Sequence, residues 1–146
     1  MPTQRKTTSL GSLTGNVGFH LRLAQLAVFK DFDGELGELG VSPAVYSVLE
    51  VLQQNPGLTQ SKLASAVRLD RSSMVPMLDK LGQRGLVERL ASTADRRHKH
   101  LYLTETGAAL LRQADKLVSK HEKRVCTPFT AREKQTLLEL LARFGG

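Results

Sequence analysis

The chain has 146 residues, of which 40% are hydrophobic and 24% are charged, and it carries a net charge of +7. This length and composition suit one folded domain, with at most a few additional helices that require a partner. They exclude a low-complexity chain, and no apolar run approaches the roughly 20 residues of a membrane span. The single cysteine, Cys126, excludes a disulfide within the chain.

The positive charge is concentrated in one segment. Nine basic and four acidic residues lie between Leu58 and Thr104, so this segment carries five of the seven net positive charges. A basic surface favours a polyanionic partner such as nucleic acid. Residues 1–15 are polar, lack the apolar core of a signal peptide and are expected to form a flexible arm. Together with the cysteine content, this predicts a cytoplasmic protein.

The first third of the chain predicts two helices. Apolar residues recur at three- or four-residue steps over residues 16–36, which is typical of a helix that buries more than one face. Three glycines that follow Phe32 are expected to weaken the end of this helix, because glycine has low helix propensity. Ser42 followed by Pro43 is a good N-cap and first-turn pair for a second helix, which extends to about Gln54.

The middle of the chain predicts a pair of short helices joined by a tight turn. Thr59 is the expected cap of the first helix and Asp70 that of the second, and Gly85 is a natural stop for the second. Pro76 removes one backbone hydrogen bond from the second helix. We expect a slight bend there and no break, because apolar residues continue at helical spacing beyond it. One exposed helix of such a pair can enter a DNA major groove.

A short hairpin is expected directly after this pair. Residues 86–90 and 100–103 are strand candidates on either side of a polar, charged connection. A basic hairpin beside the helix pair can reach the DNA backbone or the minor groove. The order of elements therefore predicts a mainly α fold with a small β-hairpin wing, in which a winged helix-turn-helix spans residues 41–104.

Helices are also expected on both sides of this unit. A long helix is predicted over residues 105–125, and Thr130 with Glu133 forms a capping box for a last helix. The apolar stripes of the first and last helices are too large for the small central unit to cover. We therefore expect residues 16–40 and 105–146 to form a helical dimerisation region, in which two chains intertwine around a two-fold axis.

Two segments carry a resemblance to a known family: LTQSKLASAVRLDRSSMVPMLDKLGQRGLVER and ADRRHKHLYLTETG. They resemble the MarR family of transcription regulators, whose wing signature is Asp-Arg-Arg followed by a short strand and Leu-Thr-x-x-Gly. The order of the predicted elements matches that family from about Asn16 to Phe144. The resemblance implies a homodimeric regulator, usually a repressor, that binds double-stranded DNA at a near-palindromic operator and is often released by a small aromatic or anionic ligand.

The resemblance also assigns DNA-binding positions. Arg97 is expected to enter the minor groove, where an arginine reads the shape of the groove, with Asp95 as its partner. The full set of expected DNA-binding residues is Arg71, Ser72, Ser73, Pro76, Met77, Lys80, Asp95, Arg96, Arg97 and Lys99. Arg68 departs from the family pattern, since many relatives have glycine at this position in the turn.

A small-molecule effector site is expected between the dimerisation helices and the DNA-binding unit. Its expected residues are His20, Arg22, Leu23, Phe29, Tyr46 and Leu49. An arginine on the first helix suits a carboxylate or the phosphorylated tail of a cofactor, so an aromatic acid or its CoA thioester is the effector class that we expect. In the alternative interpretation, these residues form a packed core with a few polar groups at its surface.

Other functions find less support in the sequence. It has no glycine-rich phosphate loop, no Ser/His/Asp arrangement and no paired carboxylates in an evident cleft, so we expect neither an enzyme nor a bound cofactor. His98 and His100 alternate on a strand near Asp95, but two imidazoles without a second cluster do not predict a metal site. Redox sensing through Cys126 and ligand-independent, architectural binding of DNA stay open as alternatives.

Arg97→Ala is expected to weaken operator binding by about 1–3 kcal/mol while the dimer persists, because the side chain would be lost from the minor groove. Fluorescence anisotropy with operator DNA at matched salt measures the difference between the two proteins. An unchanged affinity would remove Arg97 from the DNA contacts.

Overall fold

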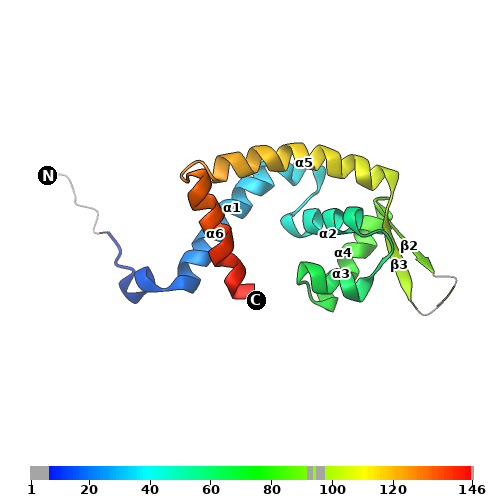
Figure 1. Ribbon diagram of the computed structural model, residues 1–146, viewed down its shortest axis with the longest axis horizontal. Helices are drawn as coiled ribbons and strands as arrows, with labels where there is room; N and C mark the ends of the chain where they lie inside the picture. Colours follow the sequence, from blue (N-terminus) through cyan, green and yellow to red (C-terminus); the bar gives the residue numbers. More distant parts are fainter. Residues whose placement is uncertain (1–6, 92–93, 95–97, 146) are drawn as a thin grey trace.

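The computed structural model describes residues 7–91, 94 and 98–145. Within these residues the chain forms helices and a small antiparallel sheet, which confirms the predicted fold class (Figure 1). The helices are η1 (Gly11–Gly15), α1 (Val17–Leu36), η2 (Gly37–Leu39), α2 (Pro43–Gln54), α3 (Gln60–Val67), α4 (Arg71–Gln83), α5 (Glu105–Val125), α6 (Ala131–Ala142) and η3 (Arg143–Gly145), where η denotes a 3-10 helix. The strands are β1 (Leu58–Thr59), β2 (Val87–Ala91) and β3 (Lys99–Leu103).

The long helix α5 connects two groups of elements. Figure 1 shows α1 and α6 at one end of α5, whereas α2, α3, α4 and the sheet lie towards its other end. Helices α1 and α6 of the predicted dimerisation region therefore lie mostly apart from the winged helix-turn-helix, whereas α5, which belongs to the same predicted region, reaches both. The segment predicted as a flexible arm contains η1, a single 3-10 turn before α1.

The helices begin where the sequence places a capping side chain. Ser42, Thr59, Asp70 and Thr104 each accept a hydrogen bond from a backbone N–H in the first turn of the following helix. The capping box of α6 is also present, with both reciprocal bonds between Thr130 and Glu133. Such bonds satisfy donors that have no partner within the helix, so they fix each helix start locally.

The glycines after Phe32 change α1 less than predicted. The helix continues through Gly34 to Leu36, because Phe32 and Leu36 are 5% and 0% exposed and anchor its last turns in a core. The chain then tightens into η2 and leaves it at Gly40, whose φ of +65° lies in the left-handed region that glycine tolerates. Helix α4 likewise continues through Pro76, as expected.

The sheet has three strands in the order β1-β3-β2. Its main ladder pairs Val87 with Leu103 at one end and Ala91 with Lys99 at the other. The first predicted strand is displaced by one residue, because the backbone N–H of Leu86 bonds to the carbonyl oxygen of Leu81 in α4 and takes no part in the ladder. The second predicted strand ends where expected and begins one residue earlier, at Lys99. Strand β1 was not predicted, since its two residues form a strand only by pairing with β3.

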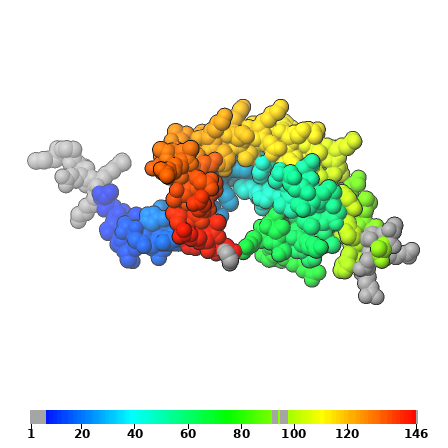
Figure 2. Space-filling model, viewed as in Figure 1, coloured from blue at the N-terminus to red at the C-terminus, as the bar shows by residue number. Residues whose placement is uncertain are grey.

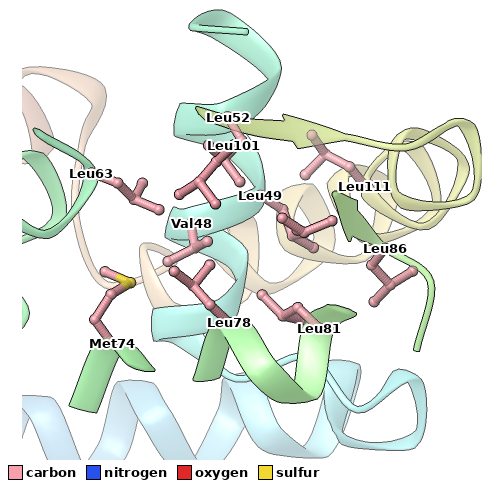
Figure 3. Packing of buried hydrophobic residues seen from close by; sticks show 11 residues of the cluster. Val48, Leu49, Leu52, Leu63, Met74, Leu78, Leu81, Leu86, Leu101 and Leu111 are labelled. Atoms are coloured by element: carbon pink, nitrogen blue, oxygen red, sulfur yellow. The ribbon is translucent and has the colours of Figure 1, made fainter. Parts of the chain in front are cut away.

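One hydrophobic core holds the helix pair, α2, the sheet and the start of α5 together (Figure 3). Its buried residues are Val48, Leu49, Leu52, Leu63, Met74, Leu78, Leu81, Leu86, Val87, Leu101 and Leu111. Helix α4 contributes three of these, at the spacing of one helical face. A second, smaller cluster of Phe32, Leu36, Val41 and Ala114 joins α1 to α5.

Helices α1 and α6 leave large apolar surfaces in water. None of the residues of α6 is buried, and Leu138 and Leu140 are 53% and 46% exposed. On α1, Val17 and Leu26 are 58% and 55% exposed. Apolar area of this extent is typical of an interaction surface. None of the helices in the described part of the chain has the length and apolarity needed to span a bilayer.

Gly107 in the first turn of α5 packs directly against the backbone of Leu86, which lies between α4 and β2. The backbone N–H of Thr104 bonds to the carbonyl oxygen of Leu86, which brings the start of α5 onto this segment. A Cβ atom on Gly107 would overlap that carbonyl oxygen and lie 2.6 Å from Cδ1 of Leu103. This close approach explains why glycine occupies the last position of the Leu-Thr-x-x-Gly pattern.

Gly107→Ala is expected to lower the free energy of unfolding by about 1–3 kcal/mol, because the added methyl group overpacks this junction. Urea denaturation measures the change. Gly34→Ala is the matched control, since Gly34 is also helical and a Cβ there meets no atom within 4 Å. The control should stabilise the protein by about 0.5–1 kcal/mol, and equal effects of the two substitutions would contradict the packing explanation.

Candidate functional site

The start of α4 is held by a charged cap. Oδ1 of Asp70 accepts hydrogen bonds of 2.7 Å from both the Ser73 backbone N–H and the Ser72 hydroxyl. These hydrogen bonds lower the pKa of the Asp70 carboxyl, and the bond from the Ser72 hydroxyl has the larger effect. The carboxylate is therefore ionised and stabilises the positive end of the helix dipole.

Helix α4 has one buried face and one exposed face. Met74, Leu78 and Leu81 are at most 1% exposed and point into the core. The predicted DNA-reading residues lie on the other side: Arg71, Ser72, Ser73, Pro76 and Lys80 are exposed, and Met77 is half-buried. Five of the six predicted residues of this helix are thus fully accessible, and Met77 packs partly against the core.

A basic cavity of about 620 Å³ lies beside the start of α4. It is lined by Thr59, Gln60, Ser61, Ala64, Arg71, Met74, Arg89, His98, Lys99 and Leu101. Arg71 and Lys99, both predicted for DNA binding, meet in this cavity although they come from α4 and β3. Cationic and hydroxyl groups of this kind suit phosphate oxygens.

The sequence interpretation did not assign the other residues of this cavity to DNA binding, among them the polar residues Gln60, Ser61 and Arg89. Gln60 and Ser61 line it from α3, and their position in the first turn after the Thr59 cap was a signal that could have found them. Arg89 lines it from β2 and is held by Asp79 at 2.8 Å. This contact depends on how α4 packs against β2, which no local pattern reveals.

The wing motif lies outside the described residues, since Asp95, Arg96 and Arg97 are not among them. Their expected DNA contacts stay predictions. On the side of β3, Lys99 is exposed, and Nδ1 of His100 lies 2.8 Å from the carbonyl oxygen of Gly57. No group of metal-binding side chains large enough to hold an ion occurs in the described part of the chain.

A second cavity, of about 700 Å³, lies on α1. It is lined by Arg22, Gln25, Leu26, Phe29, Lys30 and Asp33. Arg22 and Phe29 belong to the predicted effector site, and Leu23 is an exposed neighbour on the same helix. Lys30 adds a second cation, so this cavity combines positive charge with an aromatic wall.

The other residues of the predicted effector site lie elsewhere. His20 contacts the carbonyl oxygen of Thr14 at 2.8 Å, and Leu49 is fully buried in the main core. The hydroxyl of Tyr46 donates a 2.7 Å hydrogen bond to Asp115, so it links α2 to α5. Burial and this hydrogen bond raise the pKa of Tyr46, which keeps the hydroxyl protonated.

A polar network joins α1 to α5 near the second cavity. Asp31 accepts hydrogen bonds from Nε of Arg124 at 2.7 Å and from Nδ1 of the buried His121 at 2.8 Å. Arg124 also reaches Glu35 at 3.3 Å. The guanidinium of Arg124 holds the pKa of the Asp31 carboxyl well below its usual range, and His121 adds a smaller effect in the same direction. The network therefore keeps a carboxylate at this junction and orients two helices.

Cys126 lies at the end of α5. Its thiol is half-buried, and Sγ is 3.7 Å from Oε2 of Glu122. No second thiol of the chain can pair with it, because Cys126 is the chain's single cysteine. A redox role for this residue stays a prediction.

Comparison with known proteins identifies the family. The MarR family model matches residues 41–99, which cover α2, the helix pair and β2 and end at the first residue of β3. A proposed transcriptional regulatory protein for the hcr operon of Thauera aromatica is 38% identical over 134 residues, which are 91% of this chain and 81% of that protein. The chain belongs to the MarR family. The resemblance seen in the sequence is thereby confirmed.

Solved structures extend the similarity to the whole chain. The transcriptional repressor CouR bound to a 23-mer DNA duplex is 38% identical, with a TM-score of 0.91 over 96% of this chain and 99% of that one. CouR bound to p-coumaroyl-CoA is 36% identical, with a TM-score of 0.88 over 95% of this chain and 98% of that one. This MarR-family chain is thus similar to a winged-helix repressor throughout its length, and not in the helix-turn-helix alone.

Asp31→Asn is expected to lower the melting temperature of this MarR-family protein at about pH 6, because Arg124 and His121 stabilise the carboxylate. The folded-state pKa lies below the ordinary value of about 4, so this contribution is fully present above pH 4. It is lost as the pH falls through the folded-state pKa. The difference in melting temperature between the two proteins should therefore shrink as the pH falls below about 4.

Asp33→Asn is the control for this experiment. Asp33 lies on the same helix and is exposed, and its carboxylate has no ion pair or hydrogen bond among the described residues. It should leave the melting temperature nearly unchanged across the same pH range. If the melting temperature of Asp31→Asn stays below that of the wild type by the same amount in acid, lost packing and not lost charge is responsible.

Proposed function

We propose that the protein is a homodimeric transcription regulator that binds double-stranded DNA at specific sequences and represses transcription. The exposed face of α4, which begins at the basic cavity, is the observation that carries this proposal. A helix of this kind fits the major groove, with its first turn against base edges. The similarity to CouR, a repressor that has been solved bound to a DNA duplex, supports the proposal.

The dimer is proposed from the apolar surfaces of α1 and α6. Both helices expose large hydrophobic residues along most of their length, and a second copy of the chain can cover them. A two-fold dimer would place two copies of α4 in successive major grooves, about 34 Å apart. The matching operator is then near-palindromic.

The proposed effector is an aromatic acid or its CoA thioester. The α1 cavity offers the cations Arg22 and Lys30 for phosphate or carboxylate groups, and Phe29 and Leu26 for an aromatic ring. CouR, which is similar over most of the chain, has been solved with p-coumaroyl-CoA. The ligand would favour a dimer in which the two α4 helices no longer match the groove spacing, and DNA would be released.

A fluorescence-anisotropy titration tests this function. The probe is the DNA beside the protein's own gene, the control is a scrambled duplex, and each is measured with and without a panel of aromatic acids and their CoA thioesters. We expect the first duplex to bind roughly a thousandfold more tightly and one thioester to reverse this binding. Equal affinity for both duplexes, unaffected by every compound, would instead support an architectural DNA-binding protein.

Two variants locate the effector site in the same titration. Arg22→Ala should require about tenfold more thioester for release, because a cation that binds the phosphorylated tail is lost. Its affinity for DNA without ligand should stay near that of the wild type. Lys116→Ala, which removes an exposed cation of α5 outside the cavity, should leave release unchanged.

A further inference from the structure

Arginine side chains tie both ends of α4 to segments outside the helix pair. At its C-terminal end, Arg84 donates from Nη1 to the carbonyl oxygen of Gly40 at 2.9 Å and from Nη2 to that of Leu39 at 2.7 Å. At its N-terminal end, Arg68 in the preceding turn donates from Nη2 to the carbonyl oxygen of Gly145 at 2.7 Å. The first contact reaches the end of α1 through η2, and the second reaches η3 after α6.

The Arg84 tie is built into the corner between α1 and α2. Leu39 and Gly40 lie at the C-terminal end of η2, where free carbonyl groups attract a cation. A Cβ atom on Gly40 would lie 3.2 Å from both terminal guanidinium nitrogens. The absence of a side chain at Gly40 thus leaves room for the guanidinium group of Arg84 and also permits the left-handed turn. The two hydrogen bonds fix the orientation of the planar guanidinium group.

Arg68, which forms the hydrogen bond to Gly145, has a backbone conformation that is unfavourable for a residue with a side chain. Arg68 has φ +56°, the one positive φ of a non-glycine residue in the described part of the chain. Glycine adopts this conformation more easily, so arginine at this position gains something from its side chain. In Figure 2 the red C-terminal segment reaches the green helix-turn-helix. The hydrogen bond from Arg68 to Gly145 joins these two segments.

We propose that Arg68 and Arg84 are positioning residues for DNA binding: they set the angle of α4 relative to α1 and α6. This inference rests on the proposed dimeric function, because in a dimer that angle determines the spacing of the two α4 helices. Each α4 can read its own half-site without the ties. The ties let both helices read two half-sites at the natural spacing.

The same arrangement links the effector region to α4. Helix α1 carries the second cavity and is fixed to α5 by Arg124, and Arg84 binds η2, which follows the C-terminal end of α1. On this inference, a ligand that moves α1 would also move the end of α4, through η2.

The test compares Arg68→Gly, Arg84→Lys and the double variant with the wild type. Arg84→Lys keeps the positive charge but removes the planar guanidinium group that donates the two hydrogen bonds. Arg68→Gly removes the side-chain contact and leaves a residue that favours the left-handed turn. Arg112→Lys is the matched control, since Arg112 is an exposed arginine of α5 without a hydrogen bond or ion pair among the described residues. Circular dichroism checks that each variant is folded.

Binding is measured on three duplexes defined by footprinting the DNA beside the gene. They are the natural operator, the same operator with one base pair inserted between its half-sites, and a single half-site. The double variant should bind the natural operator about tenfold more weakly than the wild type does. It should also lose most of the wild type's preference for the natural operator over the operator with the inserted base pair. Binding to the single half-site should change less than about threefold, and Arg112→Lys should resemble the wild type throughout.

Three results would overturn the inference. Unchanged affinity and spacing preference in the double variant would show that the ties do not position α4. An equal loss on the half-site and the full operator would show that the arginines act at the DNA or through the fold of one subunit. If the wild type itself does not distinguish operator from scrambled DNA, the proposed function fails and the inference with it. Should Arg84→Lys not fold, Arg68→Gly alone is expected to shift spacing preference in the same direction.

Discussion

The burial of one face of α4 is the constraint on which the rest of the structure depends. Met74, Leu78 and Leu81 are at most 1% exposed and pack with Leu63 and Leu101. Because side chains three and four residues apart share a helical face, this packing turns the opposite, polar face of α4 outward. The exposed reading surface is therefore a consequence of the core and of the Asp70 cap, and any change that rotates the helix moves both.

Helix α5 connects this surface to the apolar end of the molecule. Its first turn packs through Gly107 against Leu86, and its last turns hold Asp31 of α1 through His121 and Arg124. One continuous helix therefore contacts both groups of elements. The proposed regulator thus has a DNA-reading unit, a connecting helix, and a pair of helices whose exposed apolar faces call for a second copy of the chain.

The features that could be predicted from sequence are local ones. Ser42 and Asp70 were identified as caps, because capping needs only the residues that follow, and the exposed side of α4 followed from its periodicity. Strand β1, the contribution of Arg89 and the tie from Arg84 to Gly40 could not be predicted, since each joins segments far apart in the chain. The effector site stays a prediction, since amphipathicity does not reveal which residues of α1 enclose a cavity.

The most direct test of the proposed architecture is the mass of the protein in solution, by sedimentation equilibrium over a range of concentrations. A two-fold dimer that covers α1 and α6 predicts one species with twice the mass of the chain, which binds one operator as a dimer. A monomer at all concentrations that still binds the operator selectively would contradict this architecture. The exposed apolar faces would then need another partner.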